Sequence, residues 1–161
     1  MAVKPIPDGY HTVTAGLCVS PCDEAITFYE KAFGATTLMR MAMNGKIGHA
    51  ELKIGDSIIF LSDEFPERPG CRSPRTLKGT TAGQYLYVPD VDAAFERAVN
   101  AGAKVLMPLA DMFWGDRYGQ VQDPFGHIWG LSTHKEDLTP EQMAQRQQAF
   151  FATAAKPGEK H

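Results

Sequence analysis

Residues 20–34 read Ser20-Pro-Cys-Asp-Glu-Ala-Ile-Thr-Phe-Tyr-Glu-Lys-Ala-Phe-Gly34, and this stretch decides the fold. Ser20 is a suitable N-cap because its hydroxyl can accept a hydrogen bond from the first helical turn, and Pro21 is favoured at the first helical position. Gly34 is typical of the residue just after a helix. The apolar residues that share one helical face are Ala25, Ile26, Tyr29, Ala32 and Phe33. We therefore predict an amphipathic helix over residues 21–33.

A second version of this stretch occurs about 69 residues further along the chain. Asp90 takes the place of the N-cap, and Gly102 takes the place of the terminal glycine. The apolar face of this second helix consists of Val91, Ala94, Phe95, Ala98 and Val99. The repeat indicates that one supersecondary unit occurs twice.

Segments with the alternation and turn residues of β-strands flank both helices. One such segment precedes each helix and three follow it. The predicted strands are residues 14–19, 36–43, 47–54 and 57–62 around the first helix, and residues 83–88, 104–108, 118–122 and 127–132 around the second. The sequence thus predicts an α+β fold of tandem βαβββ modules.

The boundaries of the modules follow from composition. The predicted parts are a first module at residues 10–64, a linker loop at 65–81, a second module at 82–134 and a C-terminal helix at 138–155. The linker is rich in Pro and Gly, and Thr139 followed by Pro140 is a helix-start signal. We expect residues 156–161 to be disordered. Each module is too small to bury a good core alone, so we expect the two to pack as one domain.

Charge and cysteine content narrow the classes of partner. The 161 residues include 16 Lys and Arg against 19 Asp and Glu, which gives a net charge of −3 at pH 7. This lacks the basic character of nucleic-acid binding, and the longest apolar runs are far shorter than the roughly 20 residues of a membrane span. The three cysteines are an odd number without the spacing of a zinc or redox pair. We expect a cytoplasmic protein that binds neither nucleic acid nor membrane.

Four motifs along the chain carry a family resemblance. They are Asp23-x-x-Ile26-x-Phe28-Tyr29-x-x-x-Phe33-Gly34-Ala35, Gly48-His49-Ala50-Glu51-Leu52-x-Ile54-Gly55-Asp56, Val88-x-Asp90-Val91-Asp92, and Gly119-x-Val121-x-Asp123-Pro124-Phe125-Gly126-His127-x-Trp129. In order and spacing they resemble the vicinal oxygen chelate superfamily of glyoxalases, bleomycin-resistance proteins and dioxygenases, and most closely its PhnB-like branch. The resemblance implies a curved mixed sheet around a cavity, helices on the outer face, and a homodimer that in some members exchanges modules.

Strand alternation indicates which side chains face this cavity. In residues 83–88, Leu86 and Val88 share one face while Tyr85 and Tyr87 share the other. If the aliphatic pair packs on the helix, both tyrosines point into the cavity.

The resemblance also implies where a catalytic metal would be held. Enzymes of the superfamily bind a divalent ion such as Zn, Ni or Fe through His and Glu side chains on the first and last strands of the modules. The corresponding positions here are Thr14 and Gly83 on the first strands and Phe60 and Gly130 on the last. None of these residues can replace an imidazole or a carboxylate. We therefore expect no metal at this site.

His49 and Glu51 are the weak candidates for catalysis. They lie two residues apart on a predicted strand, so both project from the same face. One interpretation is that they face solvent or make a cross-strand hydrogen bond. The other places them in the cavity beside Asp63 or Glu64, as ligand contacts or as an acid/base pair.

Aromatic residues gather in a loop before the third strand of the second module. Phe113 and Trp114 are suited to stack on a flat or cationic ligand, with Arg117 or Asp116 pairing a charged group. The alternative is that these aromatic residues have a structural role and fill space against the sheet or in the dimer interface.

These features together favour a metal-independent protein that binds or sequesters a drug or metabolite in the cavity of a homodimer. The expected ligand-binding residues are Phe60, Tyr85, Tyr87, Phe113, Trp114, His49 and Glu51. The alternative is an enzyme, namely a glyoxalase-type lyase, an isomerase or a dioxygenase, that uses a non-standard metal site or acid/base chemistry through His49 and Glu51. A third interpretation is a collapsed cavity and a role through the dimer interface alone.

Overall fold

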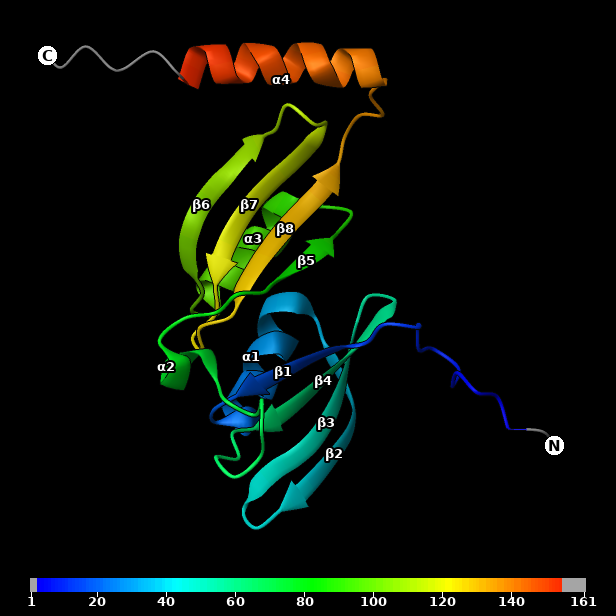
Figure 1. Ribbon diagram of the computed structural model, residues 1–161, viewed down its shortest axis with the longest axis vertical. Coiled ribbons are helices and arrows are strands. Elements are labelled where there is room, and N and C mark those ends of the chain that lie inside the picture. The colour runs from blue at the N-terminus through cyan, green and yellow to red at the C-terminus, as the bar shows by residue number, and fades with distance from the viewer. Residues whose placement is uncertain (1–2, 155–161) are drawn as a thin grey trace, which may run out of the picture.

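The computed structural model describes residues 3–154, and it contains the βαβββ repeat predicted from the sequence (Figure 1). The first module consists of β1 (Ala15–Val19), α1 (Cys22–Phe33), β2 (Thr36–Met43), β3 (Lys46–Ile54) and β4 (Ser57–Asp63). The second consists of β5 (Gly83–Tyr87), α3 (Val91–Asn100), β6 (Lys104–Asp111), β7 (Asp116–Gln122) and β8 (Ile128–His134). The remaining helices are α2 (Pro74–Leu77), between the modules, and α4 (Pro140–Ala154), after the second. Among residues 3–154, no helix is long and apolar enough to cross a membrane.

Each module forms its own four-stranded mixed sheet, in the orders β1-β4-β3-β2 and β5-β8-β7-β6. In both sheets the first strand pairs in parallel with the last, which sets Gly16 opposite Phe60 and Tyr85 opposite Gly130. The strands β1 and β5 are both edge strands, and no strand pair in the described part of the chain joins the two sheets. The α+β class is therefore confirmed, but one chain forms two separate sheets where a single curved sheet was expected.

The contact between the helices explains why the sheets stay separate. Helix α1 packs against α3, and their apolar faces share one core with β8 and the turn before it. Trp129, in this core, is 1% exposed, and its ring centre lies 4.6 Å from that of Phe33 and 5.2 Å from that of Tyr29. The modules therefore meet through their helices, and the sheet faces opposite the helices are left open.

Asp123, in the turn before β8, links the two modules through hydrogen bonds. Its Oδ2 atom accepts hydrogen bonds from the Tyr29 hydroxyl of α1 at 2.7 Å and from Trp129 Nε1 at 2.9 Å. Its Oδ1 atom accepts from the backbone N–H groups of Phe125 and His127, both at 2.9 Å. Since Asp123 is 4% exposed, these donors replace the water that a carboxylate otherwise requires.

Helix α1 begins differently from the prediction. Pro21 takes the N-cap position in place of Ser20, and it makes no side-chain capping bond. The capping acceptor is instead Asp63 of β4, whose Oδ1 atom accepts from the backbone N–H of Cys22 at 2.9 Å. The Oδ2 atom of Asp63 accepts from the backbone N–H of Ile47 at 2.7 Å, so one buried carboxylate joins β4, α1 and β3.

The starts of the other helices agree better with the sequence. The predicted caps of α3 and α4 are confirmed, because Asp90 accepts from the backbone N–H of Ala93 at 3.0 Å and Thr139 accepts from that of Gln142 at 3.3 Å. The linker contains an unpredicted short helix, α2, which Ser73 caps. The side chains of residues 140–153 in α4 are exposed or partly exposed, with none buried. The predicted tail at residues 156–161 lies outside the described residues.

Candidate functional site

Four aromatic side chains gather on the open face of the second sheet. Tyr85 and Tyr87 of β5 are 47% and 65% exposed, whereas Leu86 between them packs against the core, as strand alternation predicts. Tyr118 of β7 stacks on Tyr85 with ring centres 5.1 Å apart and an angle of 9° between the ring planes. Trp114 lies 5.9 Å from Tyr118, centre to centre. We call Tyr85, Tyr87, Trp114 and Tyr118 the aromatic cluster.

Gly130 makes room for this stack on β8. A Cβ atom at Gly130 would lie 2.8 Å from Cε2 of Tyr118 and 3.1 Å from Cδ2 of Tyr85. The first distance is shorter than real side chains show, so any other residue at 130 displaces the rings. A tyrosine ring therefore occupies the space at the last-strand position where the resemblance implies a metal ligand.

Asp116 is a buried carboxylate that holds the aromatic cluster in place through hydrogen bonds. It is 3% exposed, and it accepts hydrogen bonds from the Tyr87 hydroxyl at 3.0 Å and Trp114 Nε1 at 3.2 Å, while His134 Nδ1 lies 2.8 Å from it. Burial opposes ionisation of Asp116, but these hydrogen bonds outweigh it and hold the pKa of the carboxyl below its ordinary value. Hydrogen bonds to Asp116 and Asp137 raise the pKa of His134. The cluster thus contains an ionised carboxylate with its donors in place.

Arg117 and Phe113, which come from the same predicted loop as Trp114, do not join the aromatic cluster. Arg117 forms a two-pronged ion pair with Asp92 of α3 at 2.7 and 2.8 Å and contacts Asp111 at 3.2 Å, so it is turned toward the helix side. The structure therefore does not bring Arg117 to the aromatic cluster, because alternation on β7 turns it to the face opposite that of Asp116 and Tyr118. Phe113 continues the aromatic surface toward α4, where its ring centre lies 5.3 Å from that of Phe150.

The first sheet carries a polar cluster on its open face, formed by Tyr10, His49 and Glu51. His49 Nε2 lies 3.2 Å from Glu51 Oε1, and the Tyr10 hydroxyl donates to Glu51 Oε2. The ring of Phe60 meets that of His49 edge-on, with centres 4.9 Å apart. The hydrogen bond from Tyr10 lowers the pKa of Glu51, and burial opposes it in part. This arrangement is a hydrogen-bonded chain of three polar side chains.

Asp63 and Glu64 do not join the polar cluster, contrary to the placement considered from the sequence. Asp63 caps α1, because the helix side of β4 carries it. Glu64 Oε2 accepts from the hydroxyls of Ser73 at 3.0 Å and Thr76 at 2.8 Å, which ties the linker to the end of β4.

Sequence reasoning missed two members of these clusters. Tyr118 had a usable signal, because it shares one face with Gln120 in the predicted strand at residues 118–122. Tyr10 had none, because it precedes β1 in a segment without periodicity and reaches Glu51 only through the fold.

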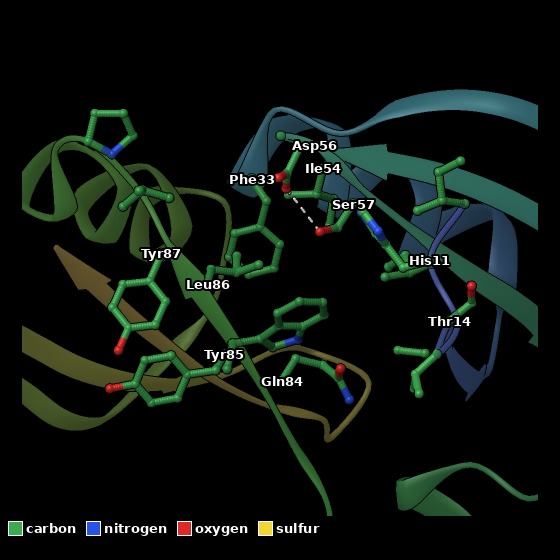
Figure 2. A pocket seen from close by; sticks show the side chains of 18 residues that line it. His11, Thr14, Phe33, Ile54, Asp56, Ser57, Gln84, Tyr85, Leu86 and Tyr87 are labelled. Atoms are coloured by element: carbon green, nitrogen blue, oxygen red, sulfur yellow. Dashed lines mark hydrogen bonds between the residues drawn. The ribbon is translucent and has the colours of Figure 1, made fainter. Parts of the chain in front are cut away.

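A cavity of about 560 Å³ lies between the modules. Figure 2 shows Tyr85, Leu86 and Tyr87 along one side of it and His11 and Thr14 along the opposite side. The wall combines aromatic and aliphatic side chains, Phe33, Leu86 and Trp129 among them, with a few polar groups, as ligand pockets commonly do. The rings of Tyr85 and Tyr87 stand at its border and extend away from His11 and Thr14 (Figure 2).

A second cavity, of about 530 Å³, lies between the N-terminal segment and the first sheet. It is lined by Glu51 and Phe60, and it shares His11 and Thr14 with the first cavity. The structure thus brings His49, Glu51 and Phe60 together and brings the aromatic cluster together. Within one chain the two groups lie on separate sheets.

The residues at the family's metal positions do not fit a metal ion. Phe60, Gly83 and Gly130 offer no side-chain donor, and Thr14 offers one hydroxyl. Across residues 3–154, no three or more His, Cys, Asp or Glu side chains are arranged to hold an ion.

Tandem βαβββ modules with an open aromatic site define an α+β protein of the glyoxalase and bleomycin-resistance type. The family model described as Glyoxalase/Bleomycin resistance protein/Dioxygenase superfamily matches residues 10–131. The chain belongs to this superfamily.

Similar proteins include chains with and without a described role. Uncharacterized protein Rv0887c of Mycobacterium tuberculosis (strain ATCC 25618 / H37Rv) is 44% identical over 130 residues, which are 79% of this chain and 76% of that protein. TioX from Micromonospora sp. ML1 has a TM-score of 0.61 at 30% identity over 77% of this chain and 98% of its own. TnmS3, an antibiotic binding protein from Streptomyces sp. CB03234, has a TM-score of 0.59 at 26% identity over 84% and 99%.

Proposed function

We propose that this protein binds a small molecule with a flat aromatic part, a drug or a metabolite, and sequesters it without a bound metal. The exposed rings of Tyr85 and Tyr87 beside the cavity of about 560 Å³ carry this proposal. Each aromatic pair adds about 0.5–1.5 kcal/mol to binding beyond the area it buries. The description of TnmS3 as an antibiotic binding protein supports the same class of function. The residue types at positions 14, 60, 83 and 130 support metal independence.

We further propose that two copies of the chain complete the cavity. Both β1 and β5 are edge strands, and such edges are suited to pairing with another chain. If β1 of one copy meets β5 of the other, the polar cluster and Phe60 of one chain face the aromatic cluster of its partner. This arrangement unites the expected lining, namely Phe60, Tyr85, Tyr87, Phe113, Trp114, His49 and Glu51, around one ligand.

A ligand screen tests the binding function. Planar aromatic and cationic compounds are added to the purified protein with and without EDTA, and the melting temperature is followed, with calorimetry on the hits. We expect hits whose effect EDTA leaves unchanged and whose affinity falls about tenfold or more in Trp114→Ala and Tyr85→Ala, because each loses a stacking surface.

Leu77→Ala is the matched control for this screen, because Leu77 is 64% exposed on α2 and lines neither of the two cavities. It should leave the affinity of every hit as it was. Hits that require an added divalent ion, or that bind Trp114→Ala as well as the wild type, would contradict the proposal.

The polar cluster favours a second function, metal-free acid/base catalysis of the isomerase or lyase type. The hydrogen bonds that link His49, Glu51 and Tyr10 are suited to moving a proton. Under this function His49→Gln abolishes turnover of a bound compound while stacking on the aromatic cluster persists. If the protein only binds, no hit is converted, and His49→Gln changes affinity alone. A lyase or dioxygenase that uses Zn, Ni or Fe would need an added ion for any turnover.

A further inference from the structure

The linker between the modules places Cys71 next to Cys18 of β1. The Sγ atoms of Cys18 and Cys71 lie 3.7 Å apart. Both thiols also point toward the carbonyl oxygen of Asp63, at 3.8 Å from Cys18 and 3.3 Å from Cys71. Both cysteines are partly exposed, whereas Cys22 is 0% exposed. An oxidant in solution can therefore reach the pair but not the remaining cysteine.

Backbone hydrogen bonds hold Cys71 in this position. The N–H of Arg68 donates to the carbonyl of Phe65 at 2.9 Å, and the N–H of Cys71 donates to the carbonyl of Arg68 at 3.2 Å. The N–H of Phe65 in turn donates to the carbonyl of Cys71 at 3.3 Å. Residues 65–71 thus form a loop closed by its own backbone hydrogen bonds. The conformation of this loop places the sulfur of Cys71 near that of Cys18. Cys18 is held in β1, whereas Cys71 lies outside any helix or strand, so the small movement that bonding needs falls to Cys71.

We propose that Cys18 and Cys71 form a reversible disulfide when the protein meets a hydroperoxide, which ties the linker to the first sheet. Hydrogen peroxide converts the Cys71 thiol to a sulfenic acid and releases one water. The Cys18 sulfur then attacks the Cys71 sulfur, so that the S–S bond forms, the S–O bond breaks and a second water leaves with the Cys18 proton. An added dithiol restores both thiols by exchange.

The surroundings of Cys18 set the pH dependence of this reaction. Burial, the Cys71 thiol, and the carboxylates of Glu64 and Asp63 raise the pKa of Cys18 to about 12. Because the thiolate is the attacking form, we expect the bond to form faster as the pH rises toward that value. The pair also lies in the wall of a cavity of about 320 Å³ that includes His49 and Phe60, so the bond would fix one side of the first module's open face.

Mass spectrometry of the whole chain tests this proposal without any ligand, so its outcome is independent of the proposed function. After hydrogen peroxide and alkylation of free thiols, we expect the chain to lose two hydrogen masses and peptide mapping to link Cys18 to Cys71. The melting temperature should rise by roughly 4 to 12 °C and fall back on reduction. Cys18→Ser should lose the link and leave a Cys71 sulfenic acid that dimedone labels.

Cys22→Ala is the matched control, since it removes the buried thiol and should keep the link. Three results would overturn the proposal. They are oxidation of Cys71 to a sulfinic acid with no link in the wild type, a disulfide between the Cys71 residues of two chains, and Cys18 and Cys71 thiols that both remain open to alkylation after peroxide.

Discussion

Asp116 and Asp123 are both buried acidic residues, yet they serve different parts of the molecule. Asp116 receives hydrogen bonds from the aromatic cluster and contacts His134, so it sets the shape of the candidate ligand surface. Asp123 receives hydrogen bonds from α1 and from its own turn, so it sets how the modules meet. In both cases the carboxylate is stable in the interior only while its donors stay in place.

His134 gives the fold a pH dependence near neutrality. Its hydrogen bonds to Asp116 and Asp137 raise the pKa of the imidazole above the ordinary value of 6.5, so the folded state favours the protonated form. This stabilisation is fully present below the unfolded pKa and is lost as the pH rises through the raised folded pKa. We expect the melting temperature of the wild type to exceed that of His134→Gln at pH about 5.5 and the gap to narrow by pH about 8.5.

The control for this measurement is His11→Gln, because His11 is exposed and makes no ion pair among the described residues. It shows how much the loss of a histidine that makes no ion pair changes the melting temperature at each pH. A gap for His134→Gln that widens as the pH rises would contradict the assignment. The lowered pKa of Asp116 does not interfere, because that carboxyl titrates at far more acidic pH.

At the scale of elements, the helix starts show what local sequence can and cannot predict. The caps of α3 and α4 lie next to their helices in the sequence, so Asp90 and Thr139 were predictable. The residue that accepts the hydrogen bond at the start of α1 is Asp63, which is distant in the sequence. It lies near the helix only because β4 pairs with β1 in the sheet. The alternation of β5 was equally local, and it placed Tyr85 and Tyr87 correctly.

Asp63 should therefore matter more to stability than an ordinary cap. Asp63→Ala leaves the N–H groups of Cys22 and Ile47 without an acceptor in a buried region, and we expect a loss of about 2–4 kcal/mol in the free energy of unfolding. Asp90→Ala, at the exposed start of α3, should cost about 1 kcal/mol. Urea unfolding of both variants measures the difference. Equal losses would show that Asp63 acts as a simple cap.

At the scale of the whole molecule, the repeat predicted the two modules, because the helix and strand patterns of each module are local in the sequence. The superfamily was predicted separately, from the resemblance of the four motifs. The separation of the two sheets was not predictable in this way. It follows from the packing of α1 against α3, and no spacing within one module encodes that contact. The polar and aromatic clusters were accordingly found on separate sheets.

A mixing experiment tests whether two chains share each cavity. One variant carries Tyr85→Ala with Trp114→Ala in the second module, and the other carries Glu51→Ala with Phe60→Ala in the first. Each alone should fail to bind a screening hit. After mixing and exchange of equal amounts, about a quarter of the wild-type sites should return if each cavity joins modules from two copies in a twofold dimer.

Cavities built within one chain would give no recovery at any mixing ratio. The size of the wild type, measured by light scattering, supplies the independent check, because the recovery requires a dimer at the concentration used. A monomer would contradict the shared cavity directly.

The close fit of Tyr118 over Gly130 has a consequence for how this scaffold can change. A metal-binding side chain introduced at position 130 would first collide with the ring of Tyr118, since even a Cβ atom lies 2.8 Å from it. The two positions are thus epistatic: a ligand at 130 is tolerated only after residue 118 has become smaller, and a smaller residue 118 alone weakens the aromatic wall. Any route toward a metal ligand at position 130 would therefore pass through an intermediate that has a weakened aromatic stack and still lacks the ligand.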